Sequence, residues 1–323
     1  MKTLSIVVPV YYNEENLPDT VPQLLALQEK LNDCWMELIF VDDGSKDHSL
    51  EVLLDFYQQY PKNIRIIKLT RNFGSMAAIQ AGFMASSGDC VAVIAADLQD
   101  PPELLLEMYH QWEGGTKVIF AVRQKREESF WRKVFSNTYY QFIRWLAIPD
   151  YPPGGFDFLL IDRQVVKELN QIREKNTNIM TLAFWLGFQP ILIPYTRRAR
   201  KKGKSRWTLV KKIRLFVDTF VSFSYFPIRG LSLFGFSLAL LTFFYGGFVF
   251  GNWLVRGVAV QGWLSTVLVV TFTSGFQMMM LGVLGEYIWR GLDETRRRPP
   301  YIIDEVYGGV SKDALITSRK DKS

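Results

Sequence analysis

The stretch that decides the fold is Ala95-Ala96-Asp97-Leu98-Gln99-Asp100-Pro101-Pro102-Glu103, at the end of an apolar run that begins at Cys90. The run is short and rich in β-branched residues, which favours a buried strand over a helix. The two prolines end the strand and suit the opening of a helix, because the first N–H of a helix has no partner. Asp97 and Gln99 would then offer oxygen ligands at the end of a strand, where a divalent cation and its phosphates could bind. Asp100 fits either this site or a cap on the following helix.

Apolar runs alternate with helical patterns in the first part of the chain. We predict strands at 5–10, 37–41, 64–69, 91–96, 118–122 and 190–194, and helices at 17–31, 47–60, 75–85, 128–146 and 176–187. This alternation is typical of an α/β protein with a parallel, doubly wound sheet. Polar residues follow several of the strands, and ligands of such sheets bind at that edge. These residues are Tyr11, Asn13, Asp42, Asp43 and Asp97.

Two common phosphate-binding motifs are missing from the sequence. No GxGxxG follows the first strand and no GxxxxGK[ST] occurs anywhere, which excludes the usual dinucleotide and P-loop sites. Asp42 and Asp43 form an adjacent pair, so one could cap a helix while the other holds a base or a ribose. Cys34 and Cys90 form no CxxC pair, and the two histidines have no zinc-ligand spacing.

Asp157 is a second candidate for chemistry. It lies between Phe156 and Phe158, just after the turn-forming stretch Pro152-Pro153-Gly154-Gly155. An acid among apolar residues is costly to bury unless it is paired or functional. We therefore consider Asp157 a candidate general base, with pairing to a nearby arginine as the alternative.

Two segments lack Asp, Glu, Lys and Arg altogether: Leu231 to Val255 and Trp263 to Gly285. Each is long enough to cross a hydrocarbon layer of about 30 Å, which predicts two transmembrane helices. Between Trp207 and Phe226, apolar residues recur every three to four positions with lysines among them. This pattern predicts a helix at the membrane interface, with packing against the globular part as the alternative.

The positive charge of the chain is concentrated in one block. The net charge is +6, and ten Lys or Arg lie between Arg197 and Arg214, so the remaining residues sum to 6 − 10 = −4. Because the block precedes a predicted span, it favours anionic headgroups or a lipid phosphate over nucleic acid. Basic residues flank both spans on the outer sides, which predicts that both termini and the globular part are cytoplasmic.

We predict four regions from these observations. They are a cytosolic α/β domain at 1–206, an amphipathic juxtamembrane helix at 207–229, a two-helix transmembrane domain at 230–290 and a cytosolic tail at 291–323. We expect a multi-pass protein of the cytoplasmic membrane, with the tail after Pro300 loosely ordered. Because two-span anchors often associate, a homo-oligomer is a further expectation.

Five motifs follow one another in a fixed order along the chain. They are Ser5-Ile6-Val7-Val8-Pro9-Val10-Tyr11-Tyr12-Asn13-Glu14, Asp42-Asp43-Gly44-Ser45, Arg71-Asn72-Phe73-Gly74, Asp97 to Glu103 and Leu284-Gly285-Glu286-Tyr287. In this order they resemble family 2 glycosyltransferases, and within them the polyprenyl-phosphate branch of dolichyl-phosphate mannose synthases and bactoprenol glucosyltransferases. The resemblance extends over nearly the whole chain, to about Tyr307.

The resemblance implies a GT-A fold, a nucleotide-sugar donor with UDP-glucose as the best guess, and Mg²⁺ or Mn²⁺ as cofactor. It implies transfer of a hexose, with inversion, to a polyprenyl phosphate. Asp97 and Gln99 would hold the metal, and Asp157 together with Asp97 would be catalytic. The nucleotide would be bound by Pro9, Tyr11, Glu14, Asp42 and Arg71. The acceptor phosphate would be bound by Arg123, Arg132, Arg200 and Ser205.

The chain departs from the family pattern at two positions. Ala95 stands where the family has the first acid of its DxD motif, and Leu159 replaces an arginine that follows the Asp157 position. The loss at Ala95 leaves a non-catalytic, membrane-anchored nucleotide-binding scaffold as an alternative. A processive polysaccharide synthase is another, but its QxxRW string should follow the catalytic acid. Here the string, Gln141 to Trp145, precedes Asp157, so we interpret it as a chance match.

Overall fold

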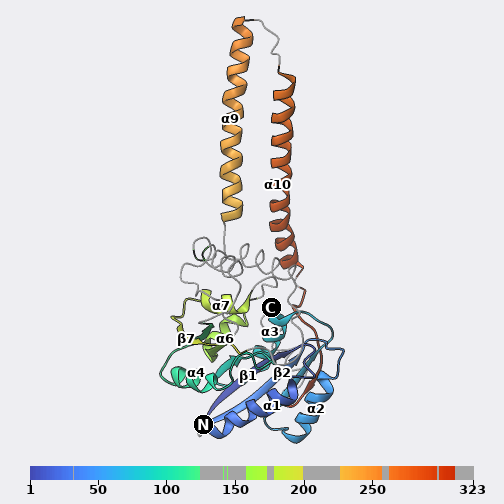
Figure 1. Ribbon diagram of the computed structural model, residues 1–323, viewed down its shortest axis with the longest axis vertical. Helices are drawn as coiled ribbons and strands as arrows, with labels where there is room; N and C mark the ends of the chain where they lie inside the picture. Colours follow the sequence, from blue (N-terminus) through green and yellow to red (C-terminus); the bar gives the residue numbers. More distant parts are fainter. Residues whose placement is uncertain are drawn as a thin grey trace. The chain divides into compact units, whose positions relative to one another are not determined.

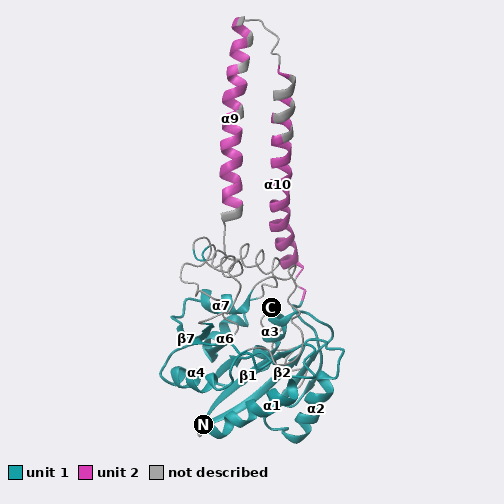
Figure 2. Ribbon diagram, viewed as in Figure 1, with its two compact units in different colours: residues 1–218, 299–323 teal, residues 219–298 magenta. Residues whose placement is uncertain are grey.

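The computed structural model describes residues 1–31, 33–123, 141, 144, 158–172, 178–198, 226–256, 262–296 and 298–309. The chain divides into two compact units (Figure 2). Unit 1 combines Met1–Asp218 with Pro299–Ser323, and unit 2 is Thr219–Arg298. The last residues of the chain therefore belong to the same unit as the first.

Unit 1 is built on one eight-stranded sheet with the order β7-β5-β6-β4-β1-β2-β3-β8. β1 to β4 are parallel, β5 and β7 are parallel to each other, and β6 and β8 run antiparallel to their neighbours. The predicted α/β class is confirmed, but the prediction of a purely parallel sheet is wrong. The strands are β1 Lys2–Val10, β2 Cys34–Asp42, β3 Ile64–Leu69, β4 Cys90–Val93, β5 Val118–Arg123, β6 Phe158–Asp162, β7 Ile191–Tyr195 and β8 Ile303–Tyr307.

Helices of unit 1 pack on both faces of the sheet, as the alternation in β1 requires. Leu4, Ile6 and Val8 contribute to a core shared with helices α1, α2 and α4. Val7 points the other way, and a Cβ added to Gly82 of α3 would lie 2.2 Å from it. The helices whose bounds are described in this unit are α1 Leu17–Leu25, η1 Ala26–Lys30, α2 Ser49–Gln59, α3 Ser75–Ala85, α4 Leu104–Glu113, α6 Arg163–Leu169 and α7 Ile179–Trp185 (Figure 1).

The tail after Pro300 is not loosely ordered where it is described. Residues 303–307 form β8 and pair antiparallel with β3 at the edge of the sheet. Tyr301 is buried, and the carbonyl of Ile302 accepts the N–H of Thr70 at 3.1 Å. Lys68 of β3 forms ion pairs with Asp304 at 2.8 Å and Glu305 at 3.1 Å. The sequence prediction failed here because the partner of this strand lies far away in the chain.

Unit 2 contains two long helices, α9 (Phe226–Arg256) and α10 (Trp263–Thr295). Pro227 lies in the first turn of α9, where a missing N–H breaks no helical bond. Of the helices within the described ranges, one is long and apolar enough to cross a membrane, at Ile228–Asn252. α10 covers the second predicted span, whose role stays a prediction.

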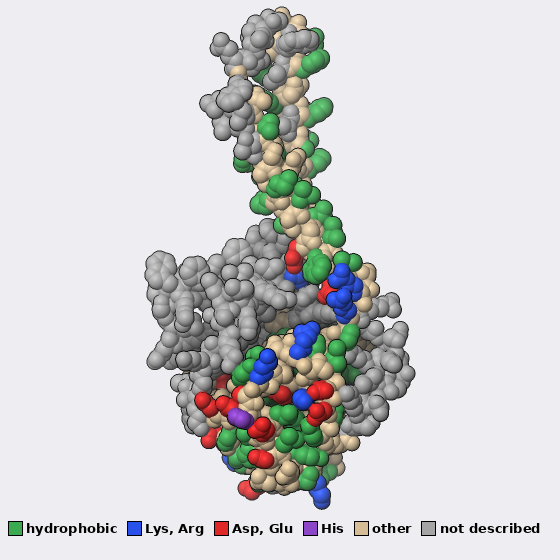
Figure 3. All heavy atoms as spheres, turned by 90° about the vertical axis from the view of Figure 1, so that its right-hand side faces the viewer, with side chains coloured by type: hydrophobic (Ala, Val, Ile, Leu, Met, Phe, Trp, Pro, Cys, Tyr) green, Lys and Arg blue, Asp and Glu red, His purple; other side chains and the backbone are tan. Residues whose placement is uncertain are grey.

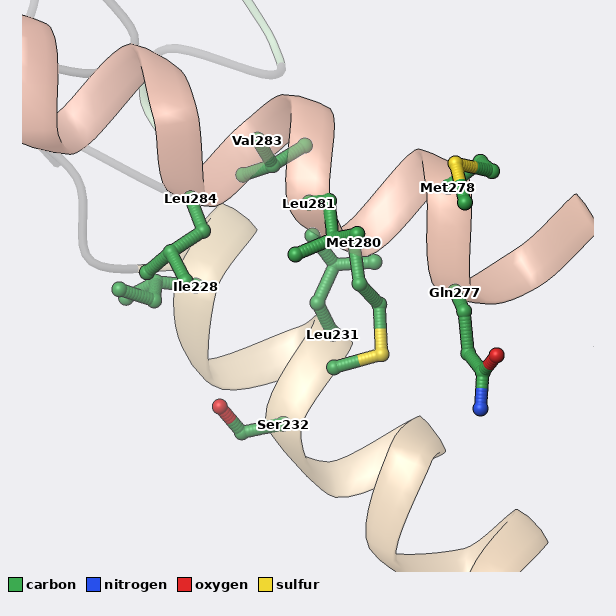
Figure 4. A pocket seen from close by; sticks show the side chains of 9 residues that line it. All are labelled: Ile228, Leu231, Ser232, Gln277, Met278, Met280, Leu281, Val283 and Leu284. Carbon is green, nitrogen blue, oxygen red and sulfur yellow. The ribbon is translucent and has the colours of Figure 1, made fainter. Parts of the chain in front are cut away.

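The two helices contact each other through small and aromatic residues. The rings of Phe234 and Phe276 lie 4.4 Å apart, and Gly235 lies against Met280. Beside this contact an open groove of about 550 Å³ is lined by apolar side chains together with Ser232 and Gln277 (Figure 4). Such a surface suits contact with acyl chains better than contact with water.

Charged and apolar side chains separate along unit 2. The visible face of the helices carries hydrophobic side chains along its length and charged ones near the end of α10 (Figure 3). There Arg290 pairs with Glu286 at 2.8 Å, and the guanidinium of Arg296 lies 5.3 Å from the ring of Trp289. Aromatic and charged residues at the end of an apolar helix are typical of a membrane interface.

Candidate active site

The described site residues lie at one edge of the sheet, where six strands that share a direction end. β1 is followed by Tyr11, β2 ends in Asp42 and β5 ends in Arg123. Arg71 follows β3, and Asp97 follows β4. The carboxyl ends of such strands are where ligands of α/β proteins bind. The structure thus brings the predicted nucleotide, metal and acceptor residues of these ranges to a common edge.

The loop after β1 is held by the loop after β2. The N–H of Tyr12 donates to Ser45 Oγ at 3.0 Å, and the N–H of Asn13 donates to Ser49 Oγ at 2.8 Å. Tyr12 has a φ of 57°, which is costly for a residue with a side chain and is often found in functional loops. The contacts of this loop therefore stabilise a backbone that the chain would not adopt by itself.

Three predicted nucleotide residues lie at this loop. Pro9 is half-buried in β1, opposite Val41. The ring of Tyr11 meets that of Tyr12 edge-on at 4.7 Å. One carboxylate oxygen of Glu14 accepts the N–H of His48 at 2.8 Å, so Glu14 also fixes the loop before α2.

The Asp42–Gly44 and Arg71–Gly74 motifs form a single interlocked structure. The carboxylate of Asp43 accepts the N–H groups of Phe73 at 2.7 Å and Gly74 at 2.9 Å. Gly44 has a φ of 68°, and an added Cβ would lie 2.6 Å from the carbonyl carbon of Arg71. Asp43 thus holds the loop that carries Arg71, and Gly44 lets the two backbones approach.

Asp42 and Asp43 have different hydrogen-bond partners. In the contacts described, neither of them caps a helix, which was the role predicted for one of the two. Asp42 accepts the N–H of Ser45 at 3.2 Å and is buried beside the loop after β1. Burial raises the pKa of Asp42 above its ordinary value. Burial likewise raises the pKa of Asp43 to about 6, although the two backbone N–H donors oppose this shift.

Arg71 is exposed at the same edge. Its guanidinium lies 4.0 Å from the centroid of the Phe73 ring and donates to the carbonyl of Asn72 at 3.1 Å. A planar cation stacked on an aromatic ring is well suited to an anionic ligand, because the ring fixes its orientation without neutralising its charge.

The Asp97–Gln99 loop has an unusual backbone. Leu98 has a φ of 53° and a buried side chain, and the N–H of Gln99 donates to Asp97 Oδ1 at 3.3 Å. The hydroxyl of Thr20 in α1 donates to the carbonyl of Ala96 at 2.8 Å, which fixes the start of the loop. Asp97 and Gln99 are half-buried, so their polar atoms remain partly accessible.

The Asp97–Gln99 loop offers few ligands for the divalent cation that the resemblance implies. Among the described residues, no group of three or more His, Cys, Asp and Glu could hold a metal. Asp97 and Gln99 supply a carboxylate and an amide oxygen, and Ala95 supplies nothing. Because Mg²⁺ usually binds one or two protein carboxylates together with substrate phosphates and water, this small donor set fits a cation held largely by a diphosphate.

Asp100 does not cap a helix. α4 begins at Leu104 with Glu103 as its N-cap residue, and no side chain caps it. The carboxylate of Asp100 is instead fully buried, where it accepts the hydroxyl of Tyr195 and pairs with Arg197 Nε at 3.3 Å. Both partners come from the end of β7 and the residues after it.

Arg123, a predicted acceptor-phosphate residue, lies next to this cluster. It is the register partner of Tyr195 on the neighbouring parallel strand. Burial and the Asp100 carboxylate raise the pKa of Tyr195, while the Arg123 guanidinium opposes the shift through a hydrogen bond and its charge. Tyr195 therefore lies between a predicted acceptor residue and the loop of the predicted metal ligands.

Four predicted site residues lie outside the described residues: Asp157, Arg132, Arg200 and Ser205. The predicted interface helix lies outside them up to residue 225, and its last four predicted residues, 226–229, belong to α9. All but Gln141 and Arg144 of the predicted 128–146 helix lie outside them as well. Phe158, which follows Asp157 in the sequence, is buried in β6 and pairs with Ala121 of β5. The proposed role of Asp157 therefore stays a prediction.

Sequence reasoning missed two positioning contacts at this edge. The first is the pair of hydrogen bonds from the Arg71 loop to Asp43. In the sequence, the only indication of this contact is that Asp43 and Arg71 follow strands predicted one after the other. Tyr195 was not singled out, although a polar aromatic residue at the end of an apolar strand points to the same edge. The network between Asp100, Tyr195 and Arg197 joins segments that are far apart in the sequence.

The family model for glycosyl transferase family 2 matches residues 5–186, a range that contains β1 to β6 and most of the described site. The chain belongs to this family. The mixed α/β sheet agrees with the GT-A fold that the resemblance implied. Asp42, Arg71, Asp97 and Arg123 all lie within the residues that the family model matches.

Relatives match the chain over nearly its full length. An uncharacterized glycosyltransferase, YkcC of Bacillus subtilis, is 37% identical over 95% of this chain and 95% of its own. A bactoprenol glucosyl transferase derived from prophage SfII of Shigella flexneri is 32% identical over 95% of this chain and 99% of its own. An undecaprenyl-phosphate 4-deoxy-4-formamido-L-arabinose transferase of Pectobacterium atrosepticum is 33% identical over 100% of this chain and 98% of its own. The resemblance to the polyprenyl-phosphate branch is confirmed.

Proposed function

We propose that this protein transfers a hexose from a nucleotide sugar to a polyprenyl phosphate at the cytoplasmic face of a membrane. The bond between the anomeric carbon and the donor's β-phosphate breaks, and a bond to an oxygen of the acceptor phosphate forms. A nucleoside diphosphate leaves, and the configuration inverts. The observation that carries the proposal is the convergence of Asp42, Arg71, Asp97 and Arg123 at one edge of the sheet.

The nucleotide half of the donor would bind at the ends of β1, β2 and β3. Asp42 offers a buried acceptor suited to the N–H of a base or the hydroxyls of a ribose. Tyr11, Pro9 and Glu14 would line the same side, and Arg71 offers an exposed cation for the phosphates. The resemblance favours UDP-glucose as the donor.

The diphosphate would lie near Asp97 and Gln99, which would hold Mg²⁺ or Mn²⁺. When bound, such a cation offsets the charge that develops on a leaving diphosphate. Arg123, with Arg132, Arg200 and Ser205, would bind the acceptor phosphate and align its oxygen behind the anomeric carbon. Because a phosphate ester is already ionised near neutral pH, Asp157 would orient the acceptor or the metal more than it would remove a proton.

The apolar helices of unit 2 support a lipid as the acceptor. The apolar length of α9, at Ile228–Asn252, supports insertion into a bilayer. α10 supplies the second predicted span, and the interface helix predicted before α9 would lie along the headgroups. A membrane-bound enzyme meets a polyprenyl phosphate in the plane of the bilayer, so no soluble carrier is required.

The test measures transfer from radiolabelled UDP-glucose to undecaprenyl phosphate in detergent, with and without Mn²⁺ or Mg²⁺. We expect a chloroform-soluble labelled product that depends on the metal. Asp97→Ala should lower the turnover by about 100-fold or more while the protein stays folded, because the charge on the leaving group is no longer offset. Wild-type turnover in Asp97→Ala would remove this residue from the mechanism.

The scaffold alternative rests on Ala95, which leaves fewer metal ligands than the family pattern has. Repeating the transfer assay with a panel of other nucleotide sugars distinguishes a non-catalytic scaffold from an enzyme that uses another donor. Lipid-linked product from any donor excludes a non-catalytic scaffold. Binding of nucleotide without product from any donor would instead favour the scaffold.

A further inference from the structure

Asp100 is an acid with a completely buried carboxylate, and it follows the predicted metal ligand Gln99 directly. A buried carboxylate is tolerated only where charge and hydrogen bonds compensate for the lost water. Tyr195 and Arg197 provide both, through the hydroxyl hydrogen bond and an ion pair at 3.3 Å. The Asp100 carboxylate is therefore buried inside unit 1, and a role as a helix cap does not explain why.

Further contacts join the same two segments. The N–H of Arg198 donates to the carbonyl of Gln99 at 2.8 Å, so the backbone of a predicted metal ligand is held directly. At the surface, Arg198 pairs with Glu103 at 3.1 Å. Residues 195–198 therefore lie against residues 99–103 through one buried cluster, one backbone bond and one exposed ion pair.

The buried cluster also reaches the acceptor side of the proposed site. Tyr195 is paired in register with Arg123 and interacts with its guanidinium. The chain beyond Arg198 continues into the basic block in which the sequence analysis places Arg200 and Ser205. Tyr195 thus contacts both Arg123 and Asp100, which directly follows Asp97 and Gln99 in the chain.

We propose that Asp100 is a positioning residue, which fixes Tyr195 and Arg197 and thereby holds the Arg123 side of the site in place relative to the Asp97–Gln99 loop. The inference rests on the proposed function, since it assigns donor and acceptor roles to these two sides. Asp100 contacts neither substrate in this scheme. It sets the distance between the groups that do.

The test compares Asp100→Asn, Tyr195→Phe and the double variant in the full-length protein. Tyr195→Phe removes a single oxygen, so it folds even if changes at Asp100 do not. We expect each single variant to lower kcat/KM for undecaprenyl phosphate by about 10- to 100-fold, as expected when reacting groups are displaced. The KM for the sugar donor in Tyr195→Phe should stay within about twofold of wild type. Because Asp100→Asn and Tyr195→Phe both disrupt the contact between Asp100 and Tyr195, kcat/KM of the double variant should be little lower than that of the more impaired single variant.

Glu103→Gln is the matched control, because it removes the exposed ion pair between the same two segments and should change kcat/KM less than about twofold. Hydrogen exchange of the peptide 191–198 gives a second readout, which does not depend on turnover. We expect faster exchange in Asp100→Asn and Tyr195→Phe than in Glu103→Gln, with exchange in β1 and β2 unchanged.

Unchanged exchange at 191–198 would overturn the proposal whatever the kinetics, and so would faster exchange with unchanged acceptor kcat/KM. Losses that multiply fully in the double variant would also overturn it, because the two residues would then act independently. If the wild-type protein transfers no sugar from any donor, the proposed function fails, and the exchange result alone decides whether Asp100 holds the two segments together.

Discussion

At the scale of single residues, the site depends on buried acids that position loops. Asp43 and Asp100 are both more than nine-tenths buried. Asp43 holds the loop that carries Arg71, and Asp100 holds Tyr195, the register partner of Arg123. Their neighbours Asp42 and Gln99 are the groups predicted to contact ligands. In each motif, one polar residue is predicted to bind a ligand and the residue next to it supports a loop, a division that a sequence pattern cannot show without the fold.

We expect Asp43 to make binding of the proposed donor sensitive to pH. Its carboxylate accepts two backbone N–H groups, and burial raises its pKa from 3.8 to about 6. Below pH 6 the protonated group is a poorer acceptor, so the loop carrying Arg71 should loosen. We expect the KM for the donor to rise by about tenfold between pH 7 and pH 5, the size of the loss of one charged hydrogen bond.

The control is Asp43→Asn, whose amide does not titrate and can accept only one of the two N–H groups. Its donor KM should be higher than that of wild type at pH 7 and should lack the step near pH 6. A step of wild-type size in Asp43→Asn would assign the pH dependence to another group. The effect of pH on folding runs in the opposite direction to its effect on donor binding. Because the pKa of Asp43 is higher in the native state than in the unfolded chain, its contribution to the free energy of unfolding falls as the pH rises from about 4 to 6.

At the scale of elements, local signals predict β1 to β5 and fail for the antiparallel strands. The apolar runs and the helices between them locate β3 and α3 at the predicted residues, because burial on both faces of a parallel sheet leaves a strong pattern. β8 has no such pattern: it carries Asp304 and Glu305 and is bounded by Pro299-Pro300 and two glycines. Its structure comes from the free edge of β3 and from Lys68, both more than two hundred residues away.

Truncation after Pro300 tests what β8 contributes. It removes the buried Tyr301 and the ion pairs of Lys68, and it leaves β3 as an unprotected edge. We expect a loss of about 3 kcal/mol or more in the free energy of unfolding of unit 1, comparable to deletion of one buried aromatic side chain. The measurement is thermal or denaturant unfolding followed in detergent.

Truncation after Gly309 is the matched control, because it keeps β8 and removes only the residues that follow. We expect its unfolding to stay close to that of the full chain. Equal melting temperatures for the two truncated proteins would show that β8 contributes little to the sheet, and the pairing with β3 would then not explain the order of the tail.

At the scale of the whole molecule, the pairing of β3 with β8 constrains how the chain could cross a membrane. β3 precedes α9 and β8 follows α10, yet both belong to unit 1. If Ile228–Asn252 crosses the bilayer once, the chain must cross again before residue 303 to return to the same side. The sequence between contains α10, so we expect α10 to be the second span, although its apolar character alone does not establish it.

Site-directed labelling tests this topology in intact cells. We expect a membrane-impermeant maleimide to label Gln261→Cys, in the connection between α9 and α10, and to label Ser323→Cys only after permeabilisation. Cys34 and Cys90 should stay unlabelled in both cases, because both are buried and burial raises the pKa of their thiols. Labelling of both introduced cysteines from outside would contradict two crossings, since the tail would then lie opposite the sheet that holds β8. Labelling of neither would mean that α9 does not cross, and the lipid acceptor would have to reach a protein that only rests on the surface of the bilayer.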